Sequence, residues 1–330
     1  MERSNRIKAI ALVATIIGPA ALAVSSAAIA QDFPTKPIRF IVPFPPGGGN
    51  DVIGRVVGQK LSERWGQQVI VDNRPGANGI IGLQLLMQSP PDGYTIAVGA
   101  AGPLAVNPGL YEKLPYNSLR DFTAITNAAN FPLLLVVHPS VNARNVRELI
   151  ALAKAEPNKL NCAFPGVGNS AHLAAELFNS MAGVKIVTVA YKGTGPTITD
   201  VLAGQVQMTF SSIPSVLPHV QAGKLRALAI GNLQRISALP DVPTIAESGV
   251  PGYEAYSWVG VVGPANMPKA VTAKINHEIV DILRVKQVGE SLTQQGAIPV
   301  GDSPEHFAAY IKAEIAKWGA VIRKANIKAE

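Results

Sequence analysis

Short runs of β-branched and apolar residues alternate along the chain with longer segments in which apolar residues recur every three or four positions. Short apolar runs bounded by turn residues are typical of buried strands, and a period near 3.6 is typical of amphipathic helices. The strands expected from this pattern span residues 38–44, 69–71, 94–98, 133–137, 160–164, 186–189, 206–210 and 225–230. The expected helices span residues 51–65, 79–88, 147–154, 170–181, 197–202 and 270–285, and a last one starts at Ser303-Pro304.

This alternation predicts an α/β fold in which mostly parallel sheets are flanked by helices. Residues 133–137 are all apolar, which is typical of a parallel strand buried on both faces. Two helices have especially clear apolar faces. These faces consist of Ile53, Val57, Leu61 and Trp65 in the first, and of Phe307, Ile311, Ile315, Trp318 and Ile322 in the last.

The first thirty residues have a different pattern. Basic residues precede an apolar run over residues 10–24, and a stretch of small residues follows and ends in Ala28-Ile29-Ala30. This is the layout of a cleavable secretory signal peptide, and the run is shorter than the roughly 20 apolar residues of a transmembrane helix. We therefore expect cleavage after Ala30 and a mature, soluble chain in the periplasm.

The composition excludes intrinsic disorder, because 48% of the residues are hydrophobic and only 15% are charged. The net charge of +7 favours anionic partners. Basic residues do not cluster with aromatic ones, so we expect no nucleic-acid partner. The single cysteine, Cys162, lies in an apolar stretch and is expected to be buried and unreactive.

No catalytic or metal-binding pattern stands out. The five histidines form no H-E-x-x-H motif, and one cysteine cannot supply a cysteine-rich metal site. Neither a G-x-S-x-G elbow nor a G-x-x-x-x-G-K-[ST] phosphate loop occurs. We therefore expect no metal, no cofactor and no enzymatic activity. An exported hydrolase stays open as an alternative, because the residues of a catalytic triad can lie far apart in sequence.

Glycine-rich loops between a predicted strand and a predicted helix recur at residues 45–50, 99–103, 165–169 and 191–195. Free backbone N–H groups at a helix N-terminus bind anions, and ligands of open α/β sheets sit at the carboxyl ends of strands. A single loop of this kind is explained by a tight turn. Four of them in an exported protein predict a site for a small organic acid.

Residues 43–51, Pro-Phe-Pro-Pro-Gly-Gly-Gly-Asn-Asp, resemble the first ligand loop of the tripartite tricarboxylate transporter receptors, also called Bug proteins. The resemblance covers essentially the whole mature chain. Further matching segments are Asn73-Arg74-Pro75-Gly76-Ala77, Pro91-Asp92-Gly93-Tyr94-Thr95, Leu114-Pro115-Tyr116, Gly166-Val167-Gly168, His172-Leu173, Tyr191-Lys192-Gly193, Gly204-Gln205-Val206 and Leu239-Pro240-Asp241-Val242-Pro243-Thr244.

The resemblance implies a periplasmic solute-binding receptor, with two α/β lobes that close on a small carboxylate. Lobe 1 would comprise residues 31–130 and 253–330, and lobe 2 residues 131–252, with crossings near Phe131 and Tyr253. The implied partner is a membrane permease of the tripartite tricarboxylate type. A sensor that presents its ligand to a membrane kinase is the alternative. We expect a monomer, because the two lobes must open and close.

The resemblance also implies a set of ligand-binding residues. Asp51 would accept from water or cap its own helix, Tyr191 would stack on a planar ligand or pack in the core, and His172 would form a structural hydrogen bond. Lobe 1 would contribute Phe44, Pro46, Gly47, Gly48, Asp51, Ala101 and Gly102. Lobe 2 would contribute Phe164, Gly168, Asn169, Tyr191, Gly193, Thr194 and Asp200.

The sequence departs from the family pattern at three of these positions. The family usually has a hydroxyl residue near Ala101, and serine where Phe164 and Asn169 stand here. Fewer hydroxyl donors leave less to hold a second carboxylate, and Phe164 would add an apolar surface. We therefore expect a ligand that has one carboxylate and an apolar or aromatic body.

Overall fold

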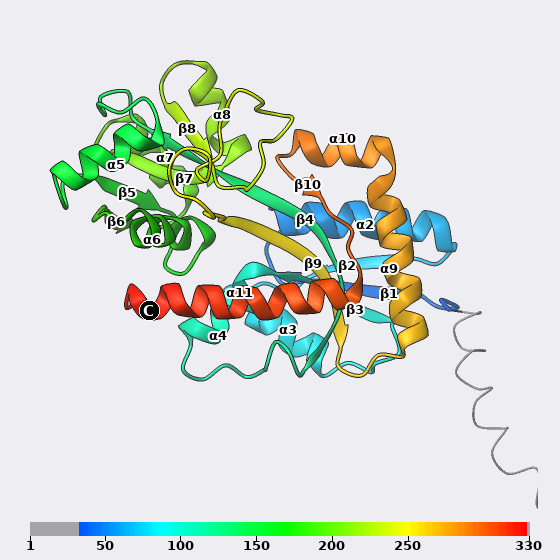
Figure 1. The fold of residues 1–330 in the computed structure, drawn as a ribbon. Helices are drawn as coiled ribbons and strands as arrows, with labels where there is room; N and C mark the ends of the chain where they lie inside the picture. Colours follow the sequence, from blue (N-terminus) through cyan, green and yellow to red (C-terminus); the bar gives the residue numbers. More distant parts are fainter. Residues whose placement is uncertain (1–32, 329–330) are drawn as a thin grey trace, which may run out of the picture.

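A computed structural model describes residues 33–328, so the predicted signal peptide and its cleavage site lie outside the described residues. Ten strands form one curved sheet in the order β2-β1-β3-β9-β4-β7-β5-β6, and β8 and β10 also pair with β4 (Figure 1). The strands are β1 (Ile38–Val42), β2 (Val69–Asn73), β3 (Thr95–Ala100), β4 (Phe122–Val137), β5 (Asn161–Phe164), β6 (Val187–Ala190), β7 (Met208–Ser212), β8 (Arg226–Ile230), β9 (Tyr256–Pro264) and β10 (Ile298–Pro299).

Helices lie against the sheet both at the group of β1 to β3 and at the group of β5 to β8 (Figure 1). They are α2 (Gly49–Trp65), α3 (Ile80–Met87), α4 (Asn107–Leu110), α5 (Val146–Ala155), α6 (Ser170–Ala182), α7 (Thr194–Leu202), α8 (Ile213–Gln221), α9 (Lys269–Arg284), α10 (Lys286–Gln294) and α11 (Pro304–Lys324). Two short helical turns, η1 (Ala77–Gly79) and η2 (Gly102–Val106), lie before α3 and α4. Among residues 33–328, no helix combines the length and the apolar character needed to cross a membrane.

The outer strands of the sheet are parallel, as predicted for an α/β fold: β1 pairs with β2 and β3, and β5 pairs with β6 and β7. The central strands are antiparallel to their neighbours, so the whole sheet is mixed. The prediction of a parallel strand at residues 133–137 is therefore wrong. This run is fully apolar because helices bury both faces of the central sheet, and such burial does not depend on strand direction.

Two long strands connect the two ends of the molecule. Residues 122–132 of β4 pair with β9, and residues 133–137 pair with β7 and β8. Figure 1 shows β4 and β9 running side by side from the group of β5 to β8 to the group of β1 to β3. The sequence pattern did not predict β9. Its Gly260 interrupts the apolar run, and a Cβ at that position would collide with the ring of Phe307.

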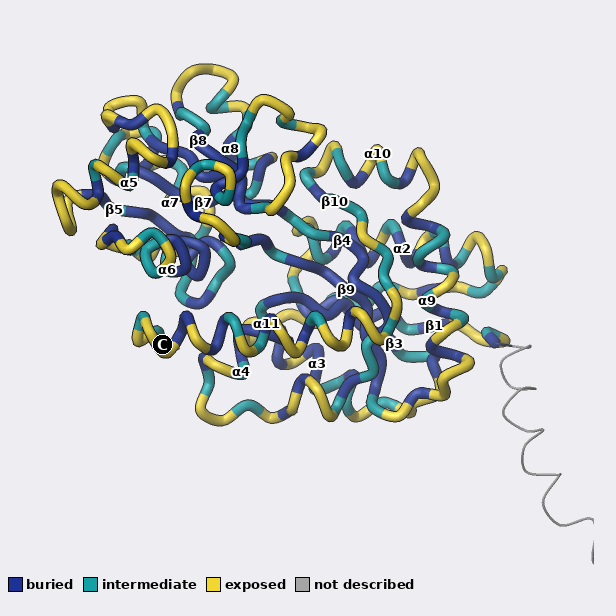
Figure 2. The backbone as a smooth tube through the Cα atoms, viewed as in Figure 1, coloured by how far each residue is buried: buried dark blue, intermediate teal, exposed yellow. Residues whose placement is uncertain are grey.

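The amphipathic helices bury the predicted faces. Ile53, Val57 and Leu61 of α2 are fully buried against the sheet. The long helix α11 passes under both groups of strands, and Figure 2 shows buried and exposed positions alternating along it. Cys162 is buried in β5, and burial raises the pKa of its thiol to about 12, as expected for an unreactive cysteine.

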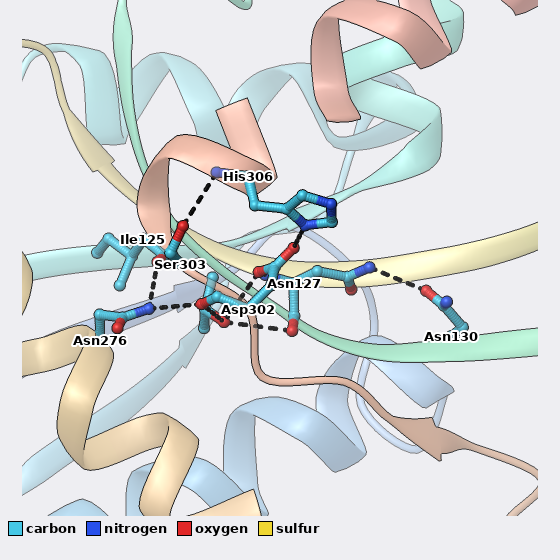
Figure 3. A network of polar contacts seen from close by, with 8 residues as sticks. Ile125, Asn127, Asn130, Asn276, Asp302, Ser303 and His306 are labelled. Atoms are coloured by element: carbon cyan, nitrogen blue, oxygen red, sulfur yellow. Dashed lines mark hydrogen bonds and ion pairs between the residues drawn. The ribbon is translucent and has the colours of Figure 1, made fainter. Parts of the chain in front are cut away.

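A partly buried polar cluster fixes the N-terminal end of α11 to the middle of β4 (Figure 3). The Asp302 carboxylate accepts from the backbone N–H of Asn127 at 2.7 Å and pairs with Nδ1 of His306 at 2.9 Å. The Asp302 carbonyl accepts from Thr126 Oγ1 and Asn276 Nδ2. These bonds occupy the place where two irregularities shift the register of β4 against β9.

Candidate functional site

The loops that follow β1, β3 and β5 meet at a cavity of about 140 Å³. Its lining residues come from both groups of strands, and none of them carries a charge. They are Phe44, Asn50, Asn78, Ala100, Ala101, Gly102, Val106, Gly168, Asn169, Ser170, Leu173, Tyr256, Ser257 and Trp318. Five predicted site residues are therefore brought together here, namely Phe44, Ala101, Gly102, Gly168 and Asn169.

Two helix N-termini open onto this cavity. The N-cap of α2 is Gly48, which has no side chain to satisfy the first backbone N–H groups of the helix. Helix α6 is capped by Asn169, whose side-chain oxygen accepts from the N–H of His172 at 2.9 Å. Unsatisfied N–H groups and the positive ends of two helix dipoles give the cavity a preference for anions.

Asp51 does not line the cavity, and it is 3% exposed. Its carboxylate accepts from the N–H of Gly47 at 2.9 Å, from Arg55 Nε at 2.8 Å and from Asn73 Nδ2 at 2.9 Å. Burial alone acts to raise the pKa of Asp51, but these hydrogen bonds hold it below its ordinary value. Asp51 therefore shapes the loop before α2 as an acceptor that is ionised near pH 7.

Phe164 does not line this cavity, so its contact with a ligand stays a prediction. Its ring is buried and stacks on His172 with the centroids 4.0 Å apart. Burial lowers the pKa of His172 to about 4, so the imidazole is neutral near pH 7. Its Nδ1 then accepts from the N–H of Gly168 at 3.2 Å, which is the structural role predicted for His172. The pair supports the loop that contributes Gly168 and Asn169.

The loop around β6 and α7 lies outside the cavity, with Tyr191, Gly193, Thr194 and Asp200. Tyr191 donates from its hydroxyl to Asp200 at 2.8 Å, so these two side chains bind each other. Pro46, Gly47 and Gly48 also lie outside the cavity and are exposed. A Cβ placed on Gly47, Gly48 or Gly193 would meet no atom within 4 Å, so these backbones face open space.

Several cavity residues were not predicted as site residues. Tyr256 and Ser257 belong to β9, which the hydrophobic pattern missed. Trp318 was predicted as a core residue on the face of α11; it is indeed buried, and its Nε1 donates to Glu314. Asn78 lies in the left-handed turn η1, where an Asn-Gly pair is a recognisable turn signal.

A larger cavity of about 450 Å³ lies between α8, residues 232–238 and the segment from α10 to β10. It contains none of the predicted site residues, and no glycine-rich loop that follows a strand reaches it. The smaller cavity is therefore the candidate binding site, because the loops of both strand groups converge there. Among residues 33–328, no group of three His, Cys, Asp or Glu side chains is placed to hold a metal ion.

Comparisons with known proteins place the chain in one family. The family model described as "Tripartite tricarboxylate transporter family receptor" matches residues 53–327. A UPF0065 protein from Pseudomonas sp. (strain P51) is 40% identical over 90% of this chain and 88% of its own. An R. palustris protein solved with adipate is 36% identical, with a TM-score of 0.77, over 90% of this chain and all of its own.

A second solved relative is MatC from Rhodopseudomonas palustris with bound malate. It is 29% identical and has a TM-score of 0.72, over 88% of this chain and 100% of its own. The family match covers most of the chain and agrees with the fold and with the resemblance of the loops. The chain therefore belongs to the tripartite tricarboxylate transporter family of periplasmic solute-binding receptors.

Proposed function

We propose that this receptor captures a small organic acid with one carboxylate and an apolar or aromatic body. The observation that carries the proposal is the uncharged cavity at the N-termini of α2 and α6. No lysine or arginine lines it, so the charge of a carboxylate would be met by backbone N–H groups, amide side chains and helix dipoles. The solved relatives with adipate and malate support carboxylates as the ligand class.

The apolar part of the proposed ligand would contact the aromatic residues of the cavity. Phe44, Tyr256 and Trp318 provide three rings, and Leu173 adds an aliphatic surface. An aromatic acid would bury its ring against them, while a second carboxylate would lose water without gaining a cationic partner. This favours a monocarboxylate over a tricarboxylate such as citrate.

Closure of two lobes would complete the site. The proposed lobes are residues 31–130 with 253–330, and residues 131–252, joined by β4 and by the connection into β9. The change of partners along β4 at residue 133 supports this division. On closure, the exposed backbone of Pro46, Gly47 and Gly48 and the loop with Gly193 and Thr194 would come against the ligand. The ligand would thereby shift the population toward the closed form.

The proposal extends to location and partners. The signal peptide would export the protein to the periplasm, where it would act as a monomer and deliver its ligand to a membrane permease. It would release that ligand chemically unchanged, as a receptor and not as a hydrolase. A sensor kinase that reads the closed form is the alternative partner, since it would need the same pocket.

The test is thermal melting of residues 31–330, refolded from guanidinium to remove bound ligand, against benzoate, phenylacetate, adipate, malate and citrate. At about 100 times its Kd, an acid stabilises the fold by about 2.7 kcal/mol, which is several degrees of melting temperature. We expect the largest shift with an aromatic monocarboxylate and recovery of the acid unchanged. A larger shift in melting temperature with citrate than with the aromatic monocarboxylates would contradict the proposed ligand. The absence of a shift with any acid would contradict the proposed function.

Gly48→Val provides the matched variant. Gly48 has an extended backbone with φ −86° and open space at its Cβ, so valine should fit the fold and project into the cleft. Gly47, by contrast, has φ +90°, where valine would strain the backbone whatever the space. We expect Gly48→Val to abolish the ligand-induced shift while Gly289→Ala, in the remote helix α10, retains it.

A further inference from the structure

One wall of the cavity carries an asparagine in an unusual conformation. Asn78 lies in the turn η1 with φ +49° and ψ +42°, in the left-handed region. Its partner is Asn107, which is completely buried at the start of α4. Asn78 Nδ2 donates to Asn107 Oδ1 at 2.7 Å, and Asn107 Nδ2 donates to the Asn78 carbonyl at 3.2 Å. Both bonds hold Asn78 at the cavity.

These two bonds determine which way each amide points. A backbone carbonyl can only accept, so the atom of Asn107 that faces it must be the NH₂ group. The other atom of the Asn107 amide is then an oxygen, and the atom of Asn78 that faces it must be a donor. The Asn78 oxygen is left over. It lies 3.3 Å from the Cβ position of Gly102, which also lines the cavity.

The loop after β5 also contributes an asparagine to the cavity, and its amide is fixed in the same way but with the reverse polarity. Asn169 uses its side-chain oxygen to cap α6 through the N–H of His172. The amide nitrogen of Asn169 is therefore the group left for a ligand, and Asn169 also lines the cavity. Asn169 thus offers a donor at the N-terminus of α6, and Asn78 offers an acceptor, as does Asn50 Oδ1, which is buried without a hydrogen-bond partner at the start of α2.

We propose that Asn78, held by Asn107, selects a ligand that carries a hydroxyl group in addition to its carboxylate. The carboxylate would face Asn169 and the helix N-termini, and the hydroxyl would donate to Asn78 Oδ1. The inference rests on the proposed function, which it narrows from aromatic or apolar monocarboxylates to their hydroxylated members. The turn that carries Asn78 is left-handed at two successive non-glycine residues, Ala77 and Asn78. Such strain is typical of functional positions.

The selectivity follows from desolvation. Asn78 is an exposed residue, so water can hydrogen-bond to its side-chain oxygen when no ligand is bound. A ligand that fills the cavity displaces this water, and only a donor on the ligand replaces its hydrogen bond. A carboxylic acid without that donor leaves the acceptor unpaired, which should weaken its binding about tenfold relative to the hydroxylated acid.

The experiment compares acids that differ only by a hydroxyl group: benzoate with its three monohydroxy isomers, phenylacetate with mandelate, and succinate with malate. Calorimetric titration gives the Kd ratio within each pair for the wild type and for Asn78→Gly. Glycine tolerates the left-handed turn, so the substitution removes the amide with little backbone strain. Asn158→Gly is the matched control, because Asn158 is also exposed, has φ +62° and lies outside the cavity.

We expect at least one hydroxylated acid to bind about tenfold more tightly than its parent, and this ratio to fall toward one in Asn78→Gly but not in Asn158→Gly. Because each ratio is measured within one protein, general loosening of the fold cancels. Asn78→Asp keeps an acceptor and should keep the ratio, although its charge weakens all acids. If Asn78→Gly does not fold, the inference is tested by the Kd ratios of the wild type and of Asn78→Asp, which should both favour the hydroxylated acid.

Two results would overturn the inference in different ways. If acids bind but no hydroxylated member is preferred, or if Asn78→Gly keeps the preference, the role of Asn78 is wrong and the proposed function stands. If no acid of any pair binds, the proposed function fails and the inference fails with it.

Discussion

At the residue scale, burial determines the chemistry of His172. The imidazole is 6% exposed and stacks on Phe164, and Glu176 lies 3.8 Å from its Nε2. Burial prevails over that carboxylate and lowers the pKa of His172 to about 4. The sequence predicted a structural hydrogen bond for His172, because it lies one turn into a helix. The donor to His172, the backbone N–H of Gly168, could not be predicted, because no local sequence pattern reveals the loop conformation that places it there.

This pKa predicts how stability depends on pH. Between about pH 6.5 and 4 the unfolded chain binds a proton at His172 that the folded chain does not, so the free energy of unfolding falls as the pH falls. Once complete, this protonation effect at His172 lowers the free energy of unfolding by about 3 kcal/mol. Urea unfolding at pH 7.5 and 4.5 should show a smaller pH difference for His172→Asn, which keeps an acceptor near Nδ1. The exposed His277→Asn is the control, and an unchanged pH difference in His172→Asn would refute the assignment.

At the element scale, the hydrophobic pattern predicted elements whose burial is one-sided. Helix α2 followed from Ile53, Val57 and Leu61, and α11 from its apolar face. The pattern missed β9, in which Gly260 leaves room for Phe307, and it assigned the wrong direction to residues 133–137. Both errors have one cause: pairing and close approach are tertiary properties, and burial on two faces looks the same in either strand direction.

The Asp302 cluster gives a prediction at this scale. Asp302→Ala should lower the free energy of unfolding by about 1–3 kcal/mol, because the buried N–H of Asn127 loses its acceptor. Asp302→Asn retains an oxygen at that position and should cost less. His306→Ala should have little effect, since the His306 side chain is 73% exposed. Urea unfolding of the three variants checks this order, and equal losses for Asp302→Ala and His306→Ala would contradict it.

At the scale of the whole molecule, the candidate site combines loops that the sequence identified with surfaces that it could not assign. Gly102 and Gly168 belong to predicted glycine-rich loops, and Phe44, which directly precedes another such loop, was predicted from the family resemblance. Tyr256 and Trp318 reach the same cavity from β9 and α11, far away in the sequence. A local pattern shows which loops can bind an anion, but only the folded chain shows which aromatic side chains lie beside them.

The proposed mechanism requires that the ligand draw the two ends of the molecule together. The exposed loops at Gly48 and Gly193 have open space in front of them, and closure would fill that space with ligand and with the opposite lobe. Small-angle X-ray scattering of residues 31–330 should therefore show a smaller radius of gyration when a tightly bound acid is added. In Gly48→Val the valine would stand in the cleft, so the same acid should leave the radius unchanged. Tight binding to the wild type with no change in the radius of gyration would mean that the ligand enters a preformed pocket. The proposed closure of two lobes would then be wrong for this receptor.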